Sequence, residues 1–154
     1  MVSVSPSFAA SPAAAGVDRF VSFFEGMTAA DLDRLGEVYA DDVHFVDPFS
    51  DFRGRDHLRR VLEGMFRQMS GYALEVEDCV ADGDAVWLRW TMRGHMRVLG
   101  REPWVVTGVS IVRFDADGRV AEHIDYWDSG SQFYQRLPLL GRIIARIRRK
   151  VAGH

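Results

Sequence analysis

The sequence is poor in cysteine and has no excess of basic residues. Cys79 is the single cysteine in 154 residues, which excludes an internal disulfide framework and a CxxC motif for metal or redox chemistry. The formal net charge is −3, so the chain lacks the basic excess of a general nucleic-acid-binding domain. We therefore expect a cytoplasmic protein that binds small molecules or proteins and no nucleic acid.

Long apolar runs are also missing. No stretch approaches the length of a membrane span, and the N-terminal residues lack the basic start and apolar run of a signal peptide. The hydrophobic content is nevertheless 47%, with ten Phe and four Trp, which suffices for the core of one domain. The composition predicts a disordered arm over residues 1–15, a folded domain over 16–130 and a helical tail over 131–154.

Apolar residues at helical spacing predict three helices in the first half of the chain. Thr28 and Asp31 form a capping-box-like start for the second helix, and Asp41 and Asp42 end it. A short extended segment and a loop over residues 51–54 precede the third. The predicted helices cover residues 17–27, 28–40 and 55–69.

Segments rich in β-branched and aromatic residues follow, separated by Gly- and Asp-containing turns. Apolar residues alternate with more polar ones in the second segment, so one face of the strand needs a cover. Helices first and strands afterwards predict an α+β domain, with the helices packed on one side of a curved antiparallel sheet. The predicted strands cover residues 72–80, 85–98, 103–114 and 120–128.

Asp47 is a carboxylate set between aromatic residues in an extended segment. Alternation along a strand places Phe45, Asp47 and Phe49 on one face, and Pro48 favours extended geometry for Asp47. A carboxylate in apolar surroundings resists ionisation, which makes it a usable proton acceptor. The alternative interpretation is an Asx turn or an exposed surface carboxylate, because Asp-Pro is common in loops.

A second polar group lies on the last predicted strand. Alternation places His123, Asp125 and Trp127 on one face of that strand. A histidine has the intrinsic pKa to exchange protons near neutrality. The alternatives are a polar pair at a dimer face, or a cap at the strand end formed by Asp128 with Trp127.

The C-terminal tail is a basic amphipathic segment. Apolar residues recur at helical spacing between Leu139 and Val151, the basic residues lie mostly off this stripe, and no acidic residue interrupts it. Pro138 separates it from a short linking helix over residues 132–137. Such a helix can pack on its own domain or across a homodimer, with arginines reaching water, or lie on an anionic membrane.

Several of these motifs together resemble the nuclear transport factor 2-like superfamily, in particular its ketosteroid isomerase and SnoaL-like cyclase branches. The similarity covers roughly residues 17–130 and the C-terminal end is similar to that of a bacterial subgroup. It implies a cone-shaped half-barrel closed by helices, a pocket inside, and a homodimer formed through the sheet. The motifs are Tyr39-Ala40-Asp41-Asp42-Val43, Asp47-Pro48, Gly54-Arg55 at a helix start, and His123-Ile124-Asp125-Tyr126-Trp127-Asp128.

The resemblance also implies roles for individual residues. Asp47 falls on the general base of ketosteroid isomerases, and Asp125, assisted by His123, is the counterpart of an acidic acid/base residue in SnoaL-like cyclases. In the related limonene epoxide hydrolases an Asp-Arg-Asp set activates water. The oxyanion-hole tyrosine of the isomerases falls on Phe23, which has no proton to donate, and their protonated aspartic acid falls near Ser110. Loss of one such donor typically costs about a hundredfold in rate, so strict steroid isomerisation is not expected.

The sequence thus predicts an isomerase- or cyclase-like enzyme that needs no cofactor and acts on a small hydrophobic, cyclic carbonyl compound, with Asp47 as general base. Two alternatives stay open, a non-catalytic protein that binds a hydrophobic ligand or lipid, and a dimeric assembly module. The histidines show no metal-ligand spacing, and no metal is predicted. The residues expected to shape the pocket are Phe23, Phe45, Phe49, Phe66, Trp90, Val106, Ser110 and Trp127.

Overall fold

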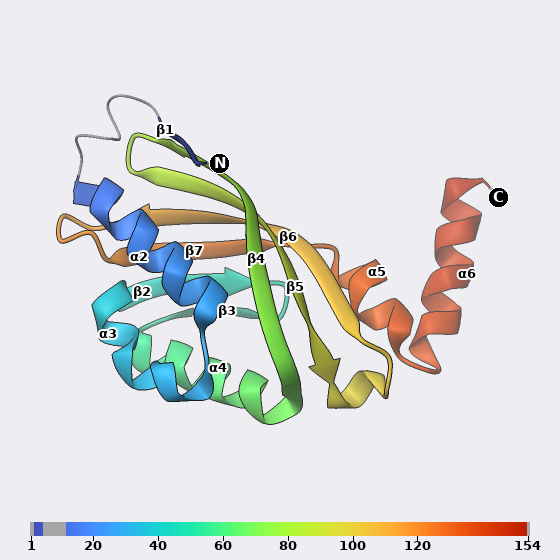
Figure 1. Ribbon diagram of the computed structural model, residues 1–154. Coiled ribbons are helices and arrows are strands. Elements are labelled where there is room, and N and C mark those ends of the chain that lie inside the picture. Colours follow the sequence, from blue (N-terminus) through green and yellow to red (C-terminus); the bar gives the residue numbers. More distant parts are fainter. Residues whose placement is uncertain (1, 5–11, 154) are drawn as a thin grey trace.

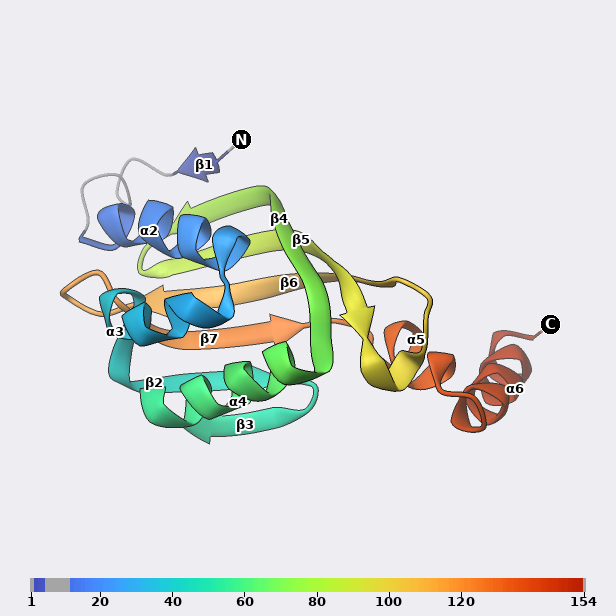
Figure 2. The ribbon, with the colours of Figure 1, turned by 60° about the horizontal axis from the view of Figure 1, so that its bottom comes forward.

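The computed structural model describes residues 2–4 and 12–153. Its centre is a seven-stranded sheet with the strand order β1-β4-β5-β6-β7-β2-β3 (Figure 1). Helices α2 and α4 and the short α3 lie on one face of this curved sheet. Helix α6 projects from the end of the molecule that is far from α2 and α3 (Figure 2). This α+β architecture confirms the predicted fold class.

The strands are β1 (Val2–Val4), β2 (Tyr39–Asp47), β3 (Ser50–Arg53), β4 (Met69–Asp82), β5 (Ala85–Met96), β6 (Trp104–Phe114) and β7 (Val120–Tyr126). The α-helices are α2 (Pro12–Gly26), α3 (Leu35–Val38), α4 (Arg55–Gln68), α5 (Ser129–Gln132) and α6 (Leu140–Ala152). Short 3-10 helices are η1 (Ala29–Arg34), η2 (Arg97–Leu99) and η3 (Tyr134–Arg136).

Strand alternation places the core as the sequence predicts. In β5, Val86, Leu88, Trp90 and Met92 are buried, whereas Arg89 on the other face is largely exposed. The helices supply the opposing apolar surface, and the side chains of Phe20 and Leu58 are completely buried against the sheet. The apolar stripe of each helix is therefore matched to the apolar face of the strands.

The sheet is mixed rather than purely antiparallel. The consecutive strands β4 to β7 pair antiparallel as predicted. However, β2 pairs parallel with β7, and β1 pairs parallel with β4. These pairings join segments that are far apart in the chain, so no local sequence pattern predicts them.

Three segments differ from the sequence prediction. The predicted second helix is shorter, because a 3-10 turn replaces its first part and Tyr39 already opens β2. The predicted loop at residues 51–54 is instead mostly β3, paired with β2 across a tight turn. The predicted disordered arm does not hold for residues 2–4, which form β1, or for residues 12–15 of α2; the rest of it lies outside the described residues.

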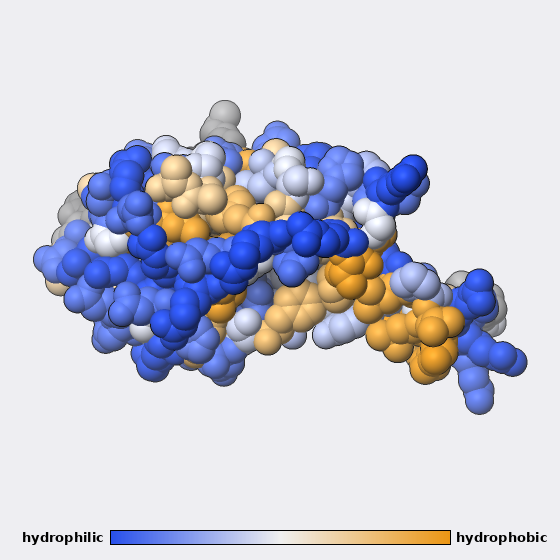
Figure 3. All heavy atoms as spheres, turned by 90° about the horizontal axis from the view of Figure 1, so that it is seen from below, coloured by the Kyte–Doolittle hydropathy of each residue, from blue (hydrophilic) through white to orange (hydrophobic). Residues whose placement is uncertain are grey.

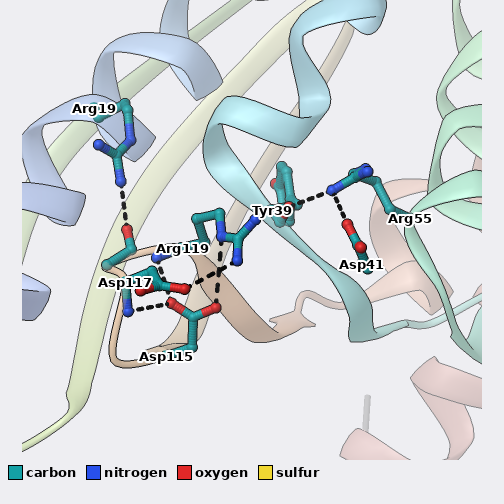
Figure 4. A network of polar contacts seen from close by, with 8 residues as sticks. Arg19, Tyr39, Asp41, Arg55, Asp115, Asp117 and Arg119 are labelled. Atoms are coloured by element: carbon teal, nitrogen blue, oxygen red, sulfur yellow. Dashed lines mark hydrogen bonds and ion pairs between the residues drawn. The ribbon is translucent and has the colours of Figure 1, made fainter.

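Arginine side chains tie the helices to the sheet (Figure 4). Arg55, at the start of α4, donates from Nη1 to the Tyr39 carbonyl oxygen at 3.2 Å and also pairs with Asp41. Arg19, on α2, donates to the Gly118 carbonyl oxygen at 2.6 Å in the β6–β7 turn. The Arg55 contacts fix the beginning of β2, where the functional site starts, and the Arg19 bond holds α2 to the β6–β7 turn.

The C-terminal segment forms the predicted amphipathic helix, α6. It is preceded by α5 and η3, which replace the single linking helix predicted for residues 132–137. Among the described residues, none of the helices has the length and apolar character required to cross a membrane.

Candidate active site

A cavity of about 340 Å³ opens between the concave face of the sheet and the helices. Its wall is mostly apolar and comes from α2, α4 and six strands, β2 to β7. Its polar groups are few, and within the described part of the chain no lysine or arginine lines it. The polar lining residues are Tyr39, Asp47, Ser50, Gln68, Tyr72, His123 and Asp125.

Asp47 and Asp125 occupy equivalent places on two paired strands. The parallel register of β2 and β7 aligns Phe45 with His123, and each carboxylate follows two residues later on the same face. Both side chains therefore line the cavity, as the alternation of each strand predicts.

Asp47 ends β2 and also caps the following turn. Its Oδ1 accepts a hydrogen bond from the Phe49 N–H at 2.8 Å. Burial raises the pKa of Asp47, the Phe49 N–H opposes this shift, and the negative charge of Asp125 adds to it. The Asx-turn interpretation and the cavity interpretation of this residue are thus both correct.

Asp125 is held by two donors on one oxygen. Its Oδ1 accepts from the Ser110 hydroxyl at 2.5 Å and lies 2.9 Å from Nε2 of His123. The Ser110 oxygen in turn accepts from the Trp90 indole N–H at 2.8 Å. The side chain of His123 is only 1% exposed, and that of Asp125 is 13% exposed.

His123 lies between two hydrogen-bond partners. An ionised Asp125 can only accept, so Nε2 of His123 donates to it. The hydroxyl of Tyr39 lies 3.1 Å from the other ring nitrogen, Nδ1. Tyr39, His123 and Asp125 thereby form a continuous hydrogen-bonded row.

The two tyrosines of the cavity are kept neutral. Burial raises the pKa of Tyr39 well above its ordinary value, and the charge of Asp125 adds to this effect. Burial likewise raises the pKa of Tyr72, whose hydroxyl donates to the Phe24 carbonyl oxygen at 3.0 Å. Both phenols are therefore hydrogen-bond donors, not bases.

The family of the chain follows from sequence comparison. The model of the SnoaL-like domain matches residues 20–123, which is more than half of the chain. The protein belongs to the SnoaL-like domain family. No curated protein matches the chain.

Solved structures share the fold of this SnoaL-like protein at low sequence identity. A Bacillus cereus protein proposed to be a polyketide cyclase is 17% identical, covers 91% of this chain and 89% of its own, and has a TM-score of 0.70. A Catenulispora acidiphila protein with a ketosteroid isomerase-like fold, solved with trimethylamine, is 20% identical over 80% and 93% of the two chains (TM-score 0.67). An LEH-like epoxide hydrolase from Mycobacterium tuberculosis is 23% identical over 89% and 96% of the two chains (TM-score 0.63).

Most of the predicted pocket residues surround this SnoaL-like cavity. Phe45, Phe49, Trp90, Val106 and Trp127 line it together with Asp47, His123 and Asp125. Ser110 does not line the cavity but lies completely buried behind it, bonded to Asp125.

Two predicted pocket residues lie elsewhere. Phe23 faces a separate surface hollow beside Arg19 and Glu37, because the face of α2 that meets the sheet carries Phe20 and Phe24. Phe66 packs edge-on against Tyr72 and faces a separate hollow between the end of α4, the start of β4 and η2. Neither residue belongs to the cavity wall.

Other residues of the cavity were not assigned from the sequence. Tyr39 was placed in a helix, and only its pairing with Val120 of β7 brings it next to His123. Methionines Met27, Met65, Met92 and Met96 also line the wall. Methionine at an apolar position does not distinguish a cavity wall from a packed core. Among the described residues, no three His, Cys, Asp or Glu side chains are grouped to hold a metal ion.

Proposed function

We propose that the protein is a cofactor-independent acid/base enzyme of isomerase or cyclase type. Its substrate is a small, hydrophobic, cyclic carbonyl compound, and Asp47 is the general base. The observation that carries this proposal is that Asp47 lines an apolar cavity in which burial and the Asp125 charge raise its pKa.

The proposed step begins with a proton on the carbon next to the carbonyl. The Asp47 carboxylate takes this proton, and the electron pair of the C–H bond moves to the carbonyl oxygen as an enolate. In an isomerase, Asp47 returns the proton to another carbon of the conjugated system. In a cyclase, the enolate carbon instead attacks a second carbonyl carbon, and the resulting alkoxide takes up the proton.

The Tyr39, His123 and Asp125 row is proposed to assist from beside Asp47, on the same face of the paired strands β2 and β7. Both hydrogen bonds to Asp125 go to Oδ1, and no described residue donates to its Oδ2. That oxygen is available to accept a proton from a substrate hydroxyl. The imidazole of His123 connects Tyr39 with Asp125, which allows a proton to be redistributed along the row.

Epoxide hydrolysis is less well supported. The Asp-Arg-Asp set of limonene epoxide hydrolases requires an arginine beside the carboxylates, and no arginine among the described residues lines this cavity. The assembly-module alternative also loses its main argument, because Trp90 and Trp127 lie in the cavity wall and leave the interior open.

An assay for enone isomerisation and for intramolecular aldol cyclisation, run on a panel of cyclic ketones, tests the proposal. We expect Asp47→Asn to lower kcat by about a hundredfold or more while the protein stays folded. Asp42→Asn is the matched control, since Asp42 is on the same strand and exposed. Undiminished turnover by Asp47→Asn excludes the assigned role.

The apolar wall also favours the second candidate, a carrier of a hydrophobic ligand. If every carbonyl substrate is left unchanged and both the parent and Asp47→Asn bind a hydrophobic dye equally well, the protein is a carrier rather than an enzyme.

We also propose a homodimer formed through the outer face of the sheet. This face exposes large apolar residues, of which Trp87 is 38%, Val109 is 38% and Tyr126 is 56% exposed. Exposed apolar side chains on adjacent strands are typical of an interface. Light scattering after gel filtration tests it, with Val109→Asp expected to give a monomer.

A further inference from the structure

The C-terminal helix α6 stands apart from the domain. Figures 1 and 2 show it projecting from the end of the molecule at which β7 leads into α5. Its apolar side chains are accordingly open, with Ile143 57%, Ile147 56% and Val151 84% exposed. Ile144 is half-buried, but the rest of this apolar face has no cover from the described part of the domain, although packing on the domain was one of the alternatives for the tail.

The same helix carries charge of one sign only. It contains no acidic residue, although the whole chain has a net charge of −3. Arg148 donates to the Gln135 side chain at 2.9 Å. Within the described part of the chain, Arg142, Arg146, Arg149 and Lys150 form no ion pair.

Apolar and basic residues occupy defined sides of α6. At 3.6 residues per turn, Leu140, Ile143, Ile147 and Val151 form one stripe. Lys150 and Arg148 then fall on opposite edges of this stripe. Figure 3 shows apolar surface in orange on the protruding part, next to strongly hydrophilic surface. Long basic side chains at both edges can extend into water while the apolar stripe between them is buried.

The base of the helix is held firmly by the domain. The Gly141 N–H donates to the Leu137 carbonyl oxygen at 2.7 Å, and a Cβ at Gly141 would lie 2.0 Å from the Gln135 carbonyl oxygen. Before it, the Trp104 indole N–H donates to the Gln132 carbonyl oxygen at 2.7 Å. The arm is thus attached through a packed segment.

We propose that α6 is a membrane-surface anchor that lies in the interface of an anionic lipid bilayer. Burial of the stripe formed by Leu140, Ile143, Ile147 and Val151 removes apolar surface from water, and the unpaired cations meet lipid phosphates. Charge complementarity identifies an anionic lipid surface as the partner of α6, because the helix carries several cations and no anion.

A second copy of α6 fits this face less well. In a two-fold contact between two α6 helices the same basic residues face one another, which places like charges together. The acidic residues of the domain offer few free partners, because many are already paired, for example Asp33 with Arg59 and Asp84 with Arg113.

Sedimentation of the full-length protein with lipid vesicles tests the proposal. We expect binding to vesicles of equal parts phosphatidylcholine and phosphatidylglycerol, and little binding to phosphatidylcholine alone. The Debye length is about 8 Å at physiological ionic strength and shorter at higher salt, so binding should be lost when the salt concentration is raised well above the physiological value. Arg146→Gln/Lys150→Gln removes two cations on one side of the stripe and is expected to weaken binding at least about tenfold. Ile143→Ser/Ile147→Ser is expected to weaken it by at least as much.

Matched controls separate the helix from general surface effects. Arg60→Gln/Arg101→Gln removes two exposed cations of the domain, and Val80→Ser/Val98→Ser removes two exposed apolar residues outside α6. Both are expected to bind vesicles like the parent. Absence of binding to anionic vesicles overturns the proposal, as does binding that the α6 variants leave unchanged. It is also overturned if vesicles are not bound and the α6 variants convert a dimer to a monomer, since the occupant is then a second copy.

Discussion

Asp47 and Asp125 lie on the same face of two parallel neighbouring strands, each two residues beyond the aligned pair Phe45 and His123. The negative charge of Asp125 thereby adds to the burial that raises the pKa of Asp47. The two carboxylates are distinguished by their surroundings, because Asp125 accepts from Ser110 and His123 whereas Asp47 lies among Phe45 and Phe49. Such a difference allows one carboxylate to serve as base while the other remains held in place.

The coupling between these residues can be measured without a substrate. Asp125→Asn removes a negative charge that disfavours ionisation of Asp47, so we expect the pKa of Asp47 to fall. Carbon-13 NMR titration of the aspartate carboxyls measures this directly. Asp128→Asn is the control, since Asp128 caps α5 and is exposed. A pKa of Asp47 that stays constant or rises in Asp125→Asn contradicts the coupling.

Asp47 is also expected to lower the stability of the protein. Its pKa is raised in the folded state, so the folded protein holds the proton more tightly than the unfolded chain, whose aspartates titrate near about 3.9. Ionised Asp47 therefore destabilises the fold above its raised pKa, and this penalty vanishes as the pH falls below about 3.9.

Asp47→Asn consequently should increase the free energy of unfolding at pH 7 by about 0.5 kcal/mol or more, as substitutions at functional sites often do. The gain should shrink as the pH is lowered through the window between the raised pKa and about pH 4. Urea unfolding at several pH values measures it, with Asp42→Asn as the control. A variant that is less stable than the parent at pH 7 refutes this account.

A buried hydrogen-bonded pair behind the cavity gives the next prediction. Ser110 is completely buried, accepts from the Trp90 indole and donates to Asp125. Ser110→Ala leaves the indole N–H without its acceptor, which should cost about 1–3 kcal/mol of unfolding free energy.

A double-mutant cycle separates this bond from the loss of packing. Trp90→Phe removes the same donor, so the effects of Ser110→Ala and Trp90→Phe should sum to more than the effect of the double variant. Denaturant unfolding of all four proteins is the measurement. Strictly additive losses show that the indole and the hydroxyl do not interact.

Strand alternation explains why much of the site could be predicted from the sequence. Side chains on a strand have a period of two, so Asp47 and Asp125 could each be assigned to the same face as their aromatic neighbours. This is a local property of the backbone, and it requires no knowledge of the partner strand.

The remaining parts of the site depend on long-range pairing. Tyr39 lies next to His123 only because β2 and β7 pair parallel, and these residues are 84 positions apart. Phe23 was placed in the pocket by family resemblance, but the rotation of α2 about its axis turns Phe20 and Phe24 inward instead. The apolar spacing of Val17, Phe20 and Phe24 agrees with this rotation, so helical periodicity was a better guide to Phe23 than the resemblance.

The glycine Gly108 supports the cavity wall from behind. A Cβ built at Gly108 would lie 2.6 Å from a ring carbon of Trp90 and 3.0 Å from the Tyr126 carbonyl oxygen. Gly108→Ala therefore must displace the Trp90 ring, which lines the cavity. We expect a loss of about 1–3 kcal/mol in unfolding free energy, the usual range for overpacking, together with weaker binding of a hydrophobic dye.

Gly64 is the control for this substitution, because it is a glycine of the cavity wall at which an added Cβ would meet open space. The nearest atom to a Cβ there is Nη2 of Arg67 at 3.7 Å, and the residue lies inside α4. Gly64→Ala should stabilise the protein by about 0.5–1 kcal/mol through helix propensity. Denaturant unfolding and dye titration of both variants compare them. If Gly108→Ala is as stable as Gly64→Ala, then the Trp90 ring does not pack closely on Gly108 of β6.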